Sequence, residues 1–222
     1  KLTMRARAEA LVGLGTARLK LGELDAAIGP LSEACDLDPE SNAPLEMLGK
    51  VYEQKGDWEE LIRMKTRGLD ALTGEPRTSL LLEIGDIYSQ KLNDRTKASK
   101  SYVAALDERP DDRRVLTKLM QLYSEEKDWS RLIDIVLKLA SMVTDTKQKA
   151  KYLHTAAIVA GRQMGELERA AKFYDEVLEL DPSLDKALGE AIDVRGQLND
   201  HEGVERLIKI QLDQATDVAE PA

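Results

Sequence analysis

The stretch GELDAAIGPLSEACDLDP at residues 22–39 sets the pattern for the rest of the sequence. Related stretches occur at residues 93–110, NDRTKASKSYVAALDERP, and at residues 165–182, GELERAAKFYDEVLELDP. The prolines that end the three stretches are spaced 71 and 72 residues apart. Regular spacing of self-similar segments indicates an array of repeats rather than one globular core.

A second pattern lies between these stretches and has the same spacing. It is marked by Trp58, Trp129 and His201, which are again 71 and 72 residues apart. Each marker follows a short turn-forming stretch that ends in Asp. The unit that repeats best is therefore two helical hairpins long, and it occurs three times.

Within each unit, apolar residues recur at the three- and four-residue spacing of one helix face. Examples are Leu45, Leu48 and Tyr52, and further along Leu116, Leu119 and Tyr123. Turn-forming residues separate segments of roughly 14 residues, and they are Gly22, Gly56, Asn93, Lys127, Gly165 and Asn199. No segment shows sustained two-residue alternation. We therefore expect twelve helices in six antiparallel hairpins and no β-strand.

This pattern resembles the tetratricopeptide repeat, a helix-turn-helix unit of about 34 residues with the motif W-x2-L-G-x2-Y, then A-x3-F, then P. The first repeat carries the motif at Leu11, Leu14, Gly15, Ala27, Leu31 and Pro39. The third carries it at Leu81, Ile84, Gly85, Tyr88, Ala98, Tyr102 and Pro110, and the fifth at Leu153, Ala156, Ala157, Ala170, Tyr174 and Pro182. The third and fifth repeats have a longer turn. The resemblance implies an all-α fold, a right-handed superhelical α-solenoid of antiparallel hairpins with about twelve helices.

The same pattern predicts the domain organisation. We expect residues 1–7 to extend the first helix, residues 8–218 to form a single solenoid domain, and residues 219–222 to be a C-terminal linker. The six repeats are expected at about 8–41, 42–75, 78–112, 113–146, 150–184 and 185–218.

The odd and even repeats differ where the two helices of a hairpin cross. The odd repeats place a small residue in the second helix, at Ala27, Ala98 and Ala170. The even repeats place a larger one there, at Leu61, Leu132 and Val204. Because larger side chains hold helix axes further apart, we expect tight and wider hairpins to alternate.

The amino-acid composition argues against several classes of protein and of partner. The chain of 222 residues has 32 Lys and Arg against 41 Asp and Glu, a net charge of −9, and 42% hydrophobic residues. These values suit an ordered chain. Aromatic residues are only 4%, which is unusual for a large β-sandwich. The acidic balance argues against nucleic acid as a partner.

The sequence indicates no catalytic residue, no cofactor and no metal, so we expect a non-enzymatic protein. Cys35 is the only cysteine, which excludes an intramolecular disulfide and a multi-cysteine metal site. His154 and His201 belong to different hairpins, and no nucleophile, metal or phosphate-loop motif appears. No run approaches the roughly 18 apolar residues of a membrane span, and the start lacks a signal peptide. We therefore expect no membrane contact and a cytoplasmic setting.

In stacked hairpins the first helix of each pair lines the concave face. On this groove the later repeats place a locally basic set of residues, although the chain as a whole is acidic. The candidate binding residues are Lys50, Arg114, Lys118, Gln121, Lys151, His154, Arg162 and Lys186. A basic strip would attract acidic peptide segments, mainly by raising the association rate. The alternative is that these are solvated helix-face charges with partners one turn away.

Two functions follow from this sequence. The first is an interaction scaffold that binds a protein or peptide in the concave groove, with the preference for acidic segments that the charges above predict. The second is a structural spacer, or a self-association segment acting through the terminal repeats, of a larger protein whose activity lies elsewhere.

Overall fold

The computed structural model describes the backbone of residues 3–217 and the side chains of residues 3–214. The linker expected at residues 219–222, and residue 218, lie outside the described residues. The described part contains twelve α-helices and no β-strand, as expected. The helices are α1 (Met4–Lys20), α2 (Leu24–Leu37), α3 (Asn42–Lys55), α4 (Trp58–Arg67), α5 (Gly74–Gln90), α6 (Arg95–Glu108), α7 (Arg113–Glu126), α8 (Trp129–Ser141), α9 (Thr146–Ile158), α10 (Leu167–Leu180), α11 (Asp185–Gln197) and α12 (His201–Asp217).

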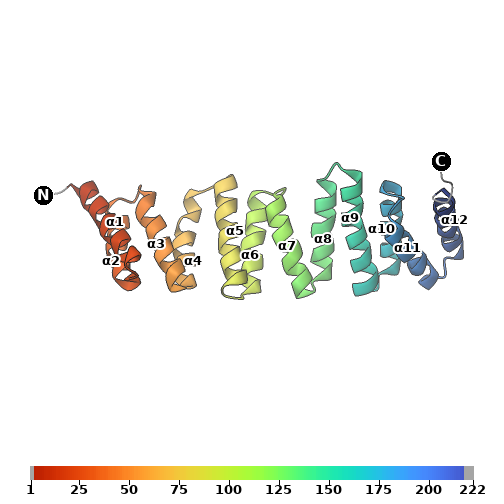
Figure 1. Cartoon of the computed structure of the whole chain (residues 1–222), viewed down its shortest axis with the longest axis horizontal. Helices are drawn as coiled ribbons and strands as arrows, with labels where there is room; N and C mark the ends of the chain where they lie inside the picture. The colour runs from red at the N-terminus through yellow and green to blue at the C-terminus, as the bar shows by residue number, and fades with distance from the viewer. Residues whose placement is uncertain (1–2, 218–222) are drawn as a thin grey trace. The chain divides into compact units, whose positions relative to one another are not determined.

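The chain divides into two compact units, residues 1–110 with α1 to α6 and residues 111–222 with α7 to α12. Each unit is a row of three antiparallel hairpins in chain order (Figure 1). Neighbouring hairpins also pack on one another, as α2 does on α3 and α10 on α11. This is the architecture of an α-solenoid, and it confirms the predicted fold class.

All six predicted turn residues have a positive φ, from 52° at Asn93 to 77° at Gly22. This left-handed conformation ends a helix because the next N–H groups then turn back to its last carbonyls. For example, the Asp57 N–H donates to the Tyr52 carbonyl at 3.0 Å. The Asp57 carboxylate in turn accepts from the Glu60 N–H and caps α4. The sequence Gly-Asp therefore ends one helix and begins the next.

The expected alternation of hairpins is observed. The paired backbones run close together in α1/α2, α5/α6 and α9/α10, and they meet over a shorter stretch in α3/α4, α7/α8 and α11/α12. In the tight hairpins glycine or alanine allows the approach: a Cβ on Gly15 would lie 2.6 Å from Leu31 Cδ2. In α3/α4 a Cβ on the corresponding Gly49 would lie 3.2 Å from the flexible methyl group of Met64 and 3.8 Å from Leu61 Cδ1.

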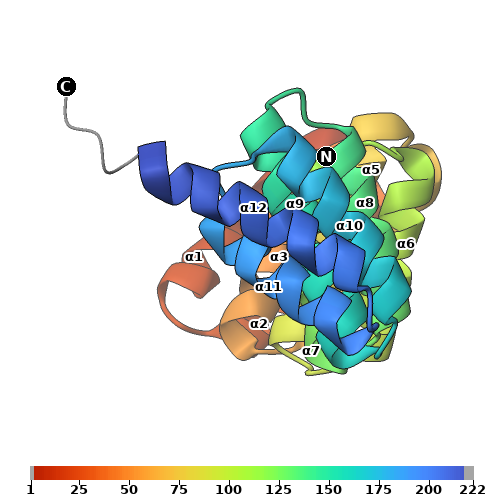
Figure 2. The same ribbon diagram turned by 90° about the vertical axis from the view of Figure 1, so that its right-hand side faces the viewer.

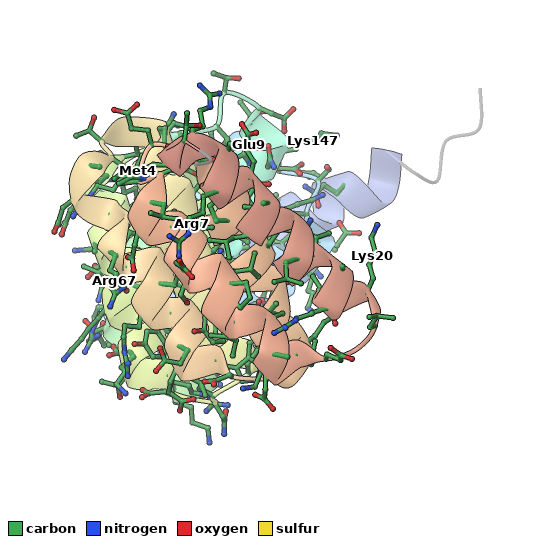
Figure 3. The ribbon with its side chains drawn as sticks, turned by 90° about the vertical axis from the view of Figure 1, so that its left-hand side faces the viewer. Met4, Arg7, Glu9, Lys20, Arg67 and Lys147 are labelled. Atoms are coloured by element: carbon green, nitrogen blue, oxygen red, sulfur yellow. The ribbon has the colours of Figure 1, made fainter. Side chains whose placement is uncertain are left out.

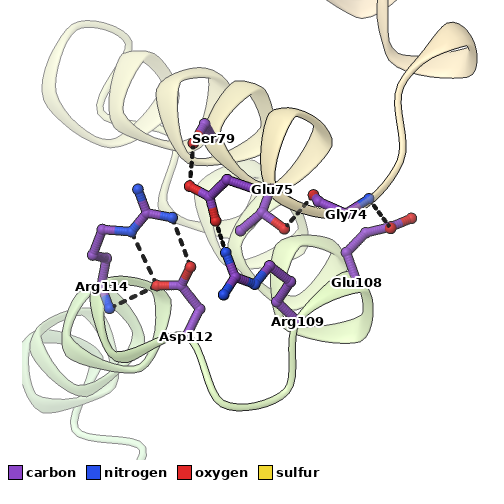
Figure 4. Close-up of polar contacts among 8 residues, drawn as sticks. Gly74, Glu75, Ser79, Glu108, Arg109, Asp112 and Arg114 are labelled. Carbon is purple, nitrogen blue, oxygen red and sulfur yellow. Dashed lines mark hydrogen bonds and ion pairs between the residues drawn. The ribbon is translucent and has the colours of Figure 1, made fainter.

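Polar contacts connect the start of α5 to the end of α6, at the end of the hairpin opposite its turn (Figure 4). Glu108, the last residue of α6, accepts from the Gly74 N–H at 3.2 Å and pairs with Arg77 at 2.9 Å. Glu75 pairs with Arg109 beside them. These contacts hold the start of α5 on the end of α6, where helix ends otherwise leave backbone groups without partners.

The structure corrects one detail of the fifth repeat. Its extra residue was expected to lengthen the turn, but Val159–Gln163 instead forms a π-helical segment, η2, that continues α9. A π-turn accommodates one additional residue without leaving the helix. A short 3-10 turn, η1 (Leu69–Ala71), likewise follows α4.

Candidate binding surface

We use the term first-helix face for the exposed residues of α1, α3 and α5 in the first unit and of α7, α9 and α11 in the second. In the first unit a cavity of about 490 Å³ opens on this face between α3, α4 and α5. Its walls include four apolar side chains, and its rim is charged. The apolar residues are Leu45, Leu61, Met64 and Leu80, and the rim residues are Glu46, Lys50, Glu53 and Lys65.

A second cavity, of about 360 Å³, lies on the opposite side of the same hairpin, between α2, α3 and α4. Leu45, Met64 and Gly68 line both cavities. Ser32 and Cys35 line only the second. Leu61, the larger residue at the helix crossing, lines the first cavity and holds α4 away from α3 there.

In the second unit a buried carboxylate organises the first-helix face. The Glu190 side chain on α11 is only 10% exposed. Its oxygens lie 2.5 Å from His154 Nε2 and accept from Arg162 at 2.8 Å and from the Tyr174 hydroxyl at 3.2 Å. The four residues come from α9, η2, α10 and α11, so the cluster ties the fifth hairpin to the sixth. A cavity of about 340 Å³ opens beside it, lined also by Asp193.

The cluster shifts the pKa values of Glu190 and Tyr174. Burial opposes ionisation of Glu190, yet the hydrogen bond and charge of His154, with Tyr174 and Arg162, hold the pKa of Glu190 below its usual value. Burial and the Glu190 carboxylate raise the pKa of the Tyr174 hydroxyl. Glu190 is therefore an ionised acceptor surrounded by donors.

The eight predicted residues are spread over both units. Lys50 lies on α3 in the first unit, and the other seven lie in the second: Arg114, Lys118 and Gln121 on α7, Lys151 and His154 on α9, Arg162 in η2 and Lys186 on α11. The structure brings His154 and Arg162 together, because both side chains contact the Glu190 carboxylate. The side chains of Lys50, Lys151 and Lys186 are exposed and form no ion pair with a described residue.

Two other predicted residues contact neighbours on their own helix. Arg114 folds back on the N-cap of α7, where its guanidinium donates to Asp112 at 2.6 and 3.1 Å (Figure 4). Those bonds, against the effect of burial, hold the pKa of the Asp112 carboxyl below its usual value. Gln121 donates to Glu125 at 3.0 Å. These side chains therefore act partly as structural contacts.

Sequence reasoning missed Glu190. A signal for it exists, because Glu190 lies between Ala187 and Ala191, both buried, on the side of α11 that packs on α10. A carboxylate at such a position requires donors. The donors could not be named without knowing that η2 directs Arg162 toward α11.

The described residues contain neither a metal site nor a membrane-spanning helix. No group of three or more His, Cys, Asp or Glu residues there could hold a metal ion. None of the helices between residues 3 and 217 has the length and apolar character needed to cross a membrane. The expected lack of catalysis and the cytoplasmic setting stay predictions.

Comparison with known proteins identifies the class. Residues 45–78, 78–112 and 150–184 match tetratricopeptide repeats. The TPR repeat-containing protein YpiA of Bacillus subtilis (strain 168) is 26% identical over 146 residues, which are 66% of this chain and 34% of that protein. This chain thus spans about a third of the length of the curated relative it matches.

One solved structure shares the fold. A chain in the structure of Naa15/Naa10 bound to HypK-THB superposes with a TM-score of 0.62 and 16% identity, over 94% of this chain and 32% of that one. The structure of YrrB, described as a TPR protein with an unusual peptide-binding site, gives a TM-score of 0.45 and 16% identity over 81% of this chain and 89% of that one. A series of helical hairpins is the architecture of a repeat protein. Tetratricopeptide repeats of this kind support a role as a scaffold for protein–protein interaction. This chain carries tetratricopeptide repeats in the stretches that match the family.

Proposed function

We propose that the chain binds an extended protein segment on its first-helix face, with an apolar side chain of that segment in the cavity between α3, α4 and α5. The observation that supports this most is the cavity itself. Its volume of about 490 Å³ lies in the range of small-ligand pockets and is large enough for an apolar side chain. Its apolar walls would gain free energy when a partner displaces water.

The helices around this cavity are held in place before binding. Leu61 is 1% exposed, and Lys65 on α4 pairs with Glu83 on α5 at 2.6 Å. A rigid surface loses little conformational entropy when it binds. The partner segment would therefore account for most of the ordering.

The exposed lysines support a preference for acidic residues on the first-helix face of each unit. Lys50 is on the rim of the cavity, and Lys151 and Lys186 lie on the first-helix face of the second unit. Since none of them forms an ion pair with a described residue, an incoming carboxylate would not have to displace one. Glu46 and Glu53 flank Lys50 on α3, so the preference is expected to be stronger in the second unit.

A displayed library of random short peptides, selected on the chain, tests the proposal. Selected peptides are measured by fluorescence polarisation against Leu80→Arg, which places a charge in the cavity, and against Ser32→Arg, which does the same in the cavity on the opposite side. We expect Leu80→Arg to weaken binding by about tenfold or more and Ser32→Arg to leave it unchanged.

Charge reversal provides the second comparison. Lys50→Glu lies on the first-helix face, and Arg63→Glu lies in the same hairpin on the other side. Acidic peptides should lose affinity with Lys50→Glu only. Circular dichroism melts confirm that each variant is folded. Equal effects of the two arginine substitutions, or no selected peptide, would refute the proposal.

A further inference from the structure

The cavity of about 340 Å³ beside the Glu190 cluster is lined by a carboxylate, Asp193, that has no ion partner. Asp193 is exposed and forms no hydrogen bond or ion pair with a described residue. All of the lining residues lie between Gly161 and Gln197, on η2, α10 and α11. Since α10 packs on both α9 and α11 (Figure 2), the cavity lies inside the second unit, between its second and third hairpins.

The other charged groups of the cavity compensate one another. Arg162 donates to the Glu190 carboxylate at 2.8 Å, and the side chain of Glu190 is only 10% exposed. One cation, Arg162, therefore faces two carboxylates, Glu190 and Asp193, and the negative charge of Asp193 is left uncompensated. A cation is the occupant whose charge complements this lining.

The end of α11 favours the same kind of occupant. Gln197 also lines the cavity and is the last residue of α11, where a helix carries a partial negative charge. Its exposed side-chain amide offers an oxygen acceptor close to the cavity. Leu167 and Val194 add apolar walls. Oxygen acceptors beside apolar walls suit an ammonium or guanidinium group on a methylene stem, which is the side chain of lysine or arginine.

Positive charges lie further along the same first-helix face. Lys186 is on α11, seven residues before Asp193, and Lys151 is at the corresponding position on α9, 35 residues earlier. Lys147, at the start of α9 (Figure 3), lies one turn before Lys151. Because an α-helix rises 1.5 Å per residue, Lys186 and Asp193 are about 10 Å apart along α11. The face therefore has a basic end and an acidic end.

We propose that the cavity receives a lysine or arginine side chain of the segment that binds the first-helix face, with Asp193 as its ion partner. An acidic residue of the same segment then pairs with Lys186 or Lys151. This specificity rests on the proposed function, and it requires a segment with charges of both signs. Side chains on one side of an extended chain recur about every 6.6 Å, so the two charged residues are expected two to four positions apart.

Selection on a chain whose first-unit cavity is blocked tests the site in the second unit. A displayed library of random short peptides is selected on Leu80→Arg, so that peptides anchored between α3, α4 and α5 are not recovered. We expect the selected peptides to be enriched in Lys or Arg two to four positions from Asp or Glu. Fluorescence polarisation then measures them on chains that carry Asp193→Lys, Asp193→Asn or Glu176→Lys in addition to Leu80→Arg. Glu176→Lys is the control, since it makes the same change of charge at an exposed position of α10.

A charge exchange identifies the contact. Asp193→Lys should weaken binding by about tenfold and Asp193→Asn by less, whereas Glu176→Lys should leave it unchanged. When the basic residue of the peptide is replaced by Glu, affinity should fall on the chain with Asp193 and recover on the chain with Asp193→Lys. Circular dichroism confirms that each variant is folded, and Asp193→Asn removes the charge with almost no change of shape.

The result separates this specificity from the proposed function. Recovery of no peptide on Leu80→Arg, of peptides without a basic residue, or equal effects of Asp193→Lys and Glu176→Lys would overturn the specificity. Peptides selected on the unmodified chain that lose affinity with Leu80→Arg would still support the apolar anchor in the first unit. If those peptides ignore Leu80→Arg while the charge exchange succeeds, the apolar anchor is refuted and the basic side-chain site at Asp193 is supported.

Discussion

Gly85 on α5 lies against the ring of Tyr102 on α6, so closely that an added Cβ would be 2.6 Å from Tyr102 Cδ1. The Tyr102 hydroxyl donates to Asp86, the next residue along α5, at 2.6 Å. The aromatic ring and the missing side chain together set the spacing of this hairpin. Tyr102 is 2% exposed and so has no room to move away.

We expect Gly85→Ala to destabilise the chain by about 2 kcal/mol, because overpacking a rigid contact exceeds the gain in helix propensity. Gly49→Ala, at the same position of the wider α3/α4 hairpin, should be nearly neutral since Met64 can move into the adjacent cavity. Chemical denaturation measures both. Gly189→Ala, where an added Cβ meets nothing within 4 Å, is the control and should stabilise by about 0.5–1 kcal/mol. Equal effects at Gly85 and Gly49 would contradict the alternation of tight and wide hairpins.

The Glu190 cluster predicts an acid-sensitive contribution to stability. The pKa of Glu190 is lower in the folded chain than in the unfolded one, so its contribution is present above the unfolded value, near 4.3, and is lost as the pH falls through the folded value. We expect Glu190→Gln to lower the free energy of unfolding at neutral pH by about 1–3 kcal/mol.

The difference between wild type and Glu190→Gln should shrink below about pH 4. Urea denaturation at a series of pH values measures it. Glu179→Gln, at an exposed position of α10, serves as the control and should show little difference at any pH. A constant difference between wild type and Glu190→Gln across the series would show that the carboxylate charge is not what stabilises the cluster.

The left-handed turn residues predict a reciprocal pair of substitutions. Lys127 has φ 58°, and Gly56, which lies 71 residues earlier at the same place in the two-hairpin repeat, has φ 68°. Because glycine adopts this conformation without the steric cost of a Cβ, Lys127→Gly should stabilise and Gly56→Lys destabilise by about 1 kcal/mol each. Thermal melts measure whether each variant is more or less stable than the wild type. Two changes of the same sign would mean that side-chain contacts, not backbone conformation, dominate at these turns.

The surroundings of Cys35 predict that its thiol reacts slowly with alkylating reagents. Burial, and to a smaller extent the negative charge of Asp36, raises the pKa of the Cys35 thiol. Alkylation by iodoacetamide near neutral pH should therefore be much slower in the native chain than in urea, since the thiolate is the reactive form. Asp36→Asn should accelerate the native reaction by less than about tenfold. An acceleration to the unfolded rate would assign the protection to charge instead of burial.

Local patterns predicted the fold well because each element depends on residues near it in sequence. Gly22, Gly56 and Gly165 end helices through their own backbone conformation, and Asp57 and Asp94 cap the helices that follow. The small Ala98 and the larger Leu61 predicted which hairpins are tight and which are wide. Hydrophobic spacing placed all twelve helices.

The candidate site was harder to predict, because it depends on which side chains meet between helices. His154 lies on α9 and Arg162 in η2, which continues that helix, but the partner of both is Glu190, from the next hairpin. Arg114 was expected to face a ligand, and its contact with Asp112 follows from the local cap of α7. Spacing along a helix indicates which face a residue occupies but not which charge lies opposite it.

The π-helical segment Val159–Gln163 determines how far the residues that follow it are rotated about the axis of α9. An α-helix turns by about 100° per residue, so removal of Gly161 would rotate Arg162 away from Glu190, or else rotate the whole of α9 relative to α10. A single inserted residue therefore works here as an angular adjustment between two hairpins, and a one-residue deletion would uncouple them without changing any charge.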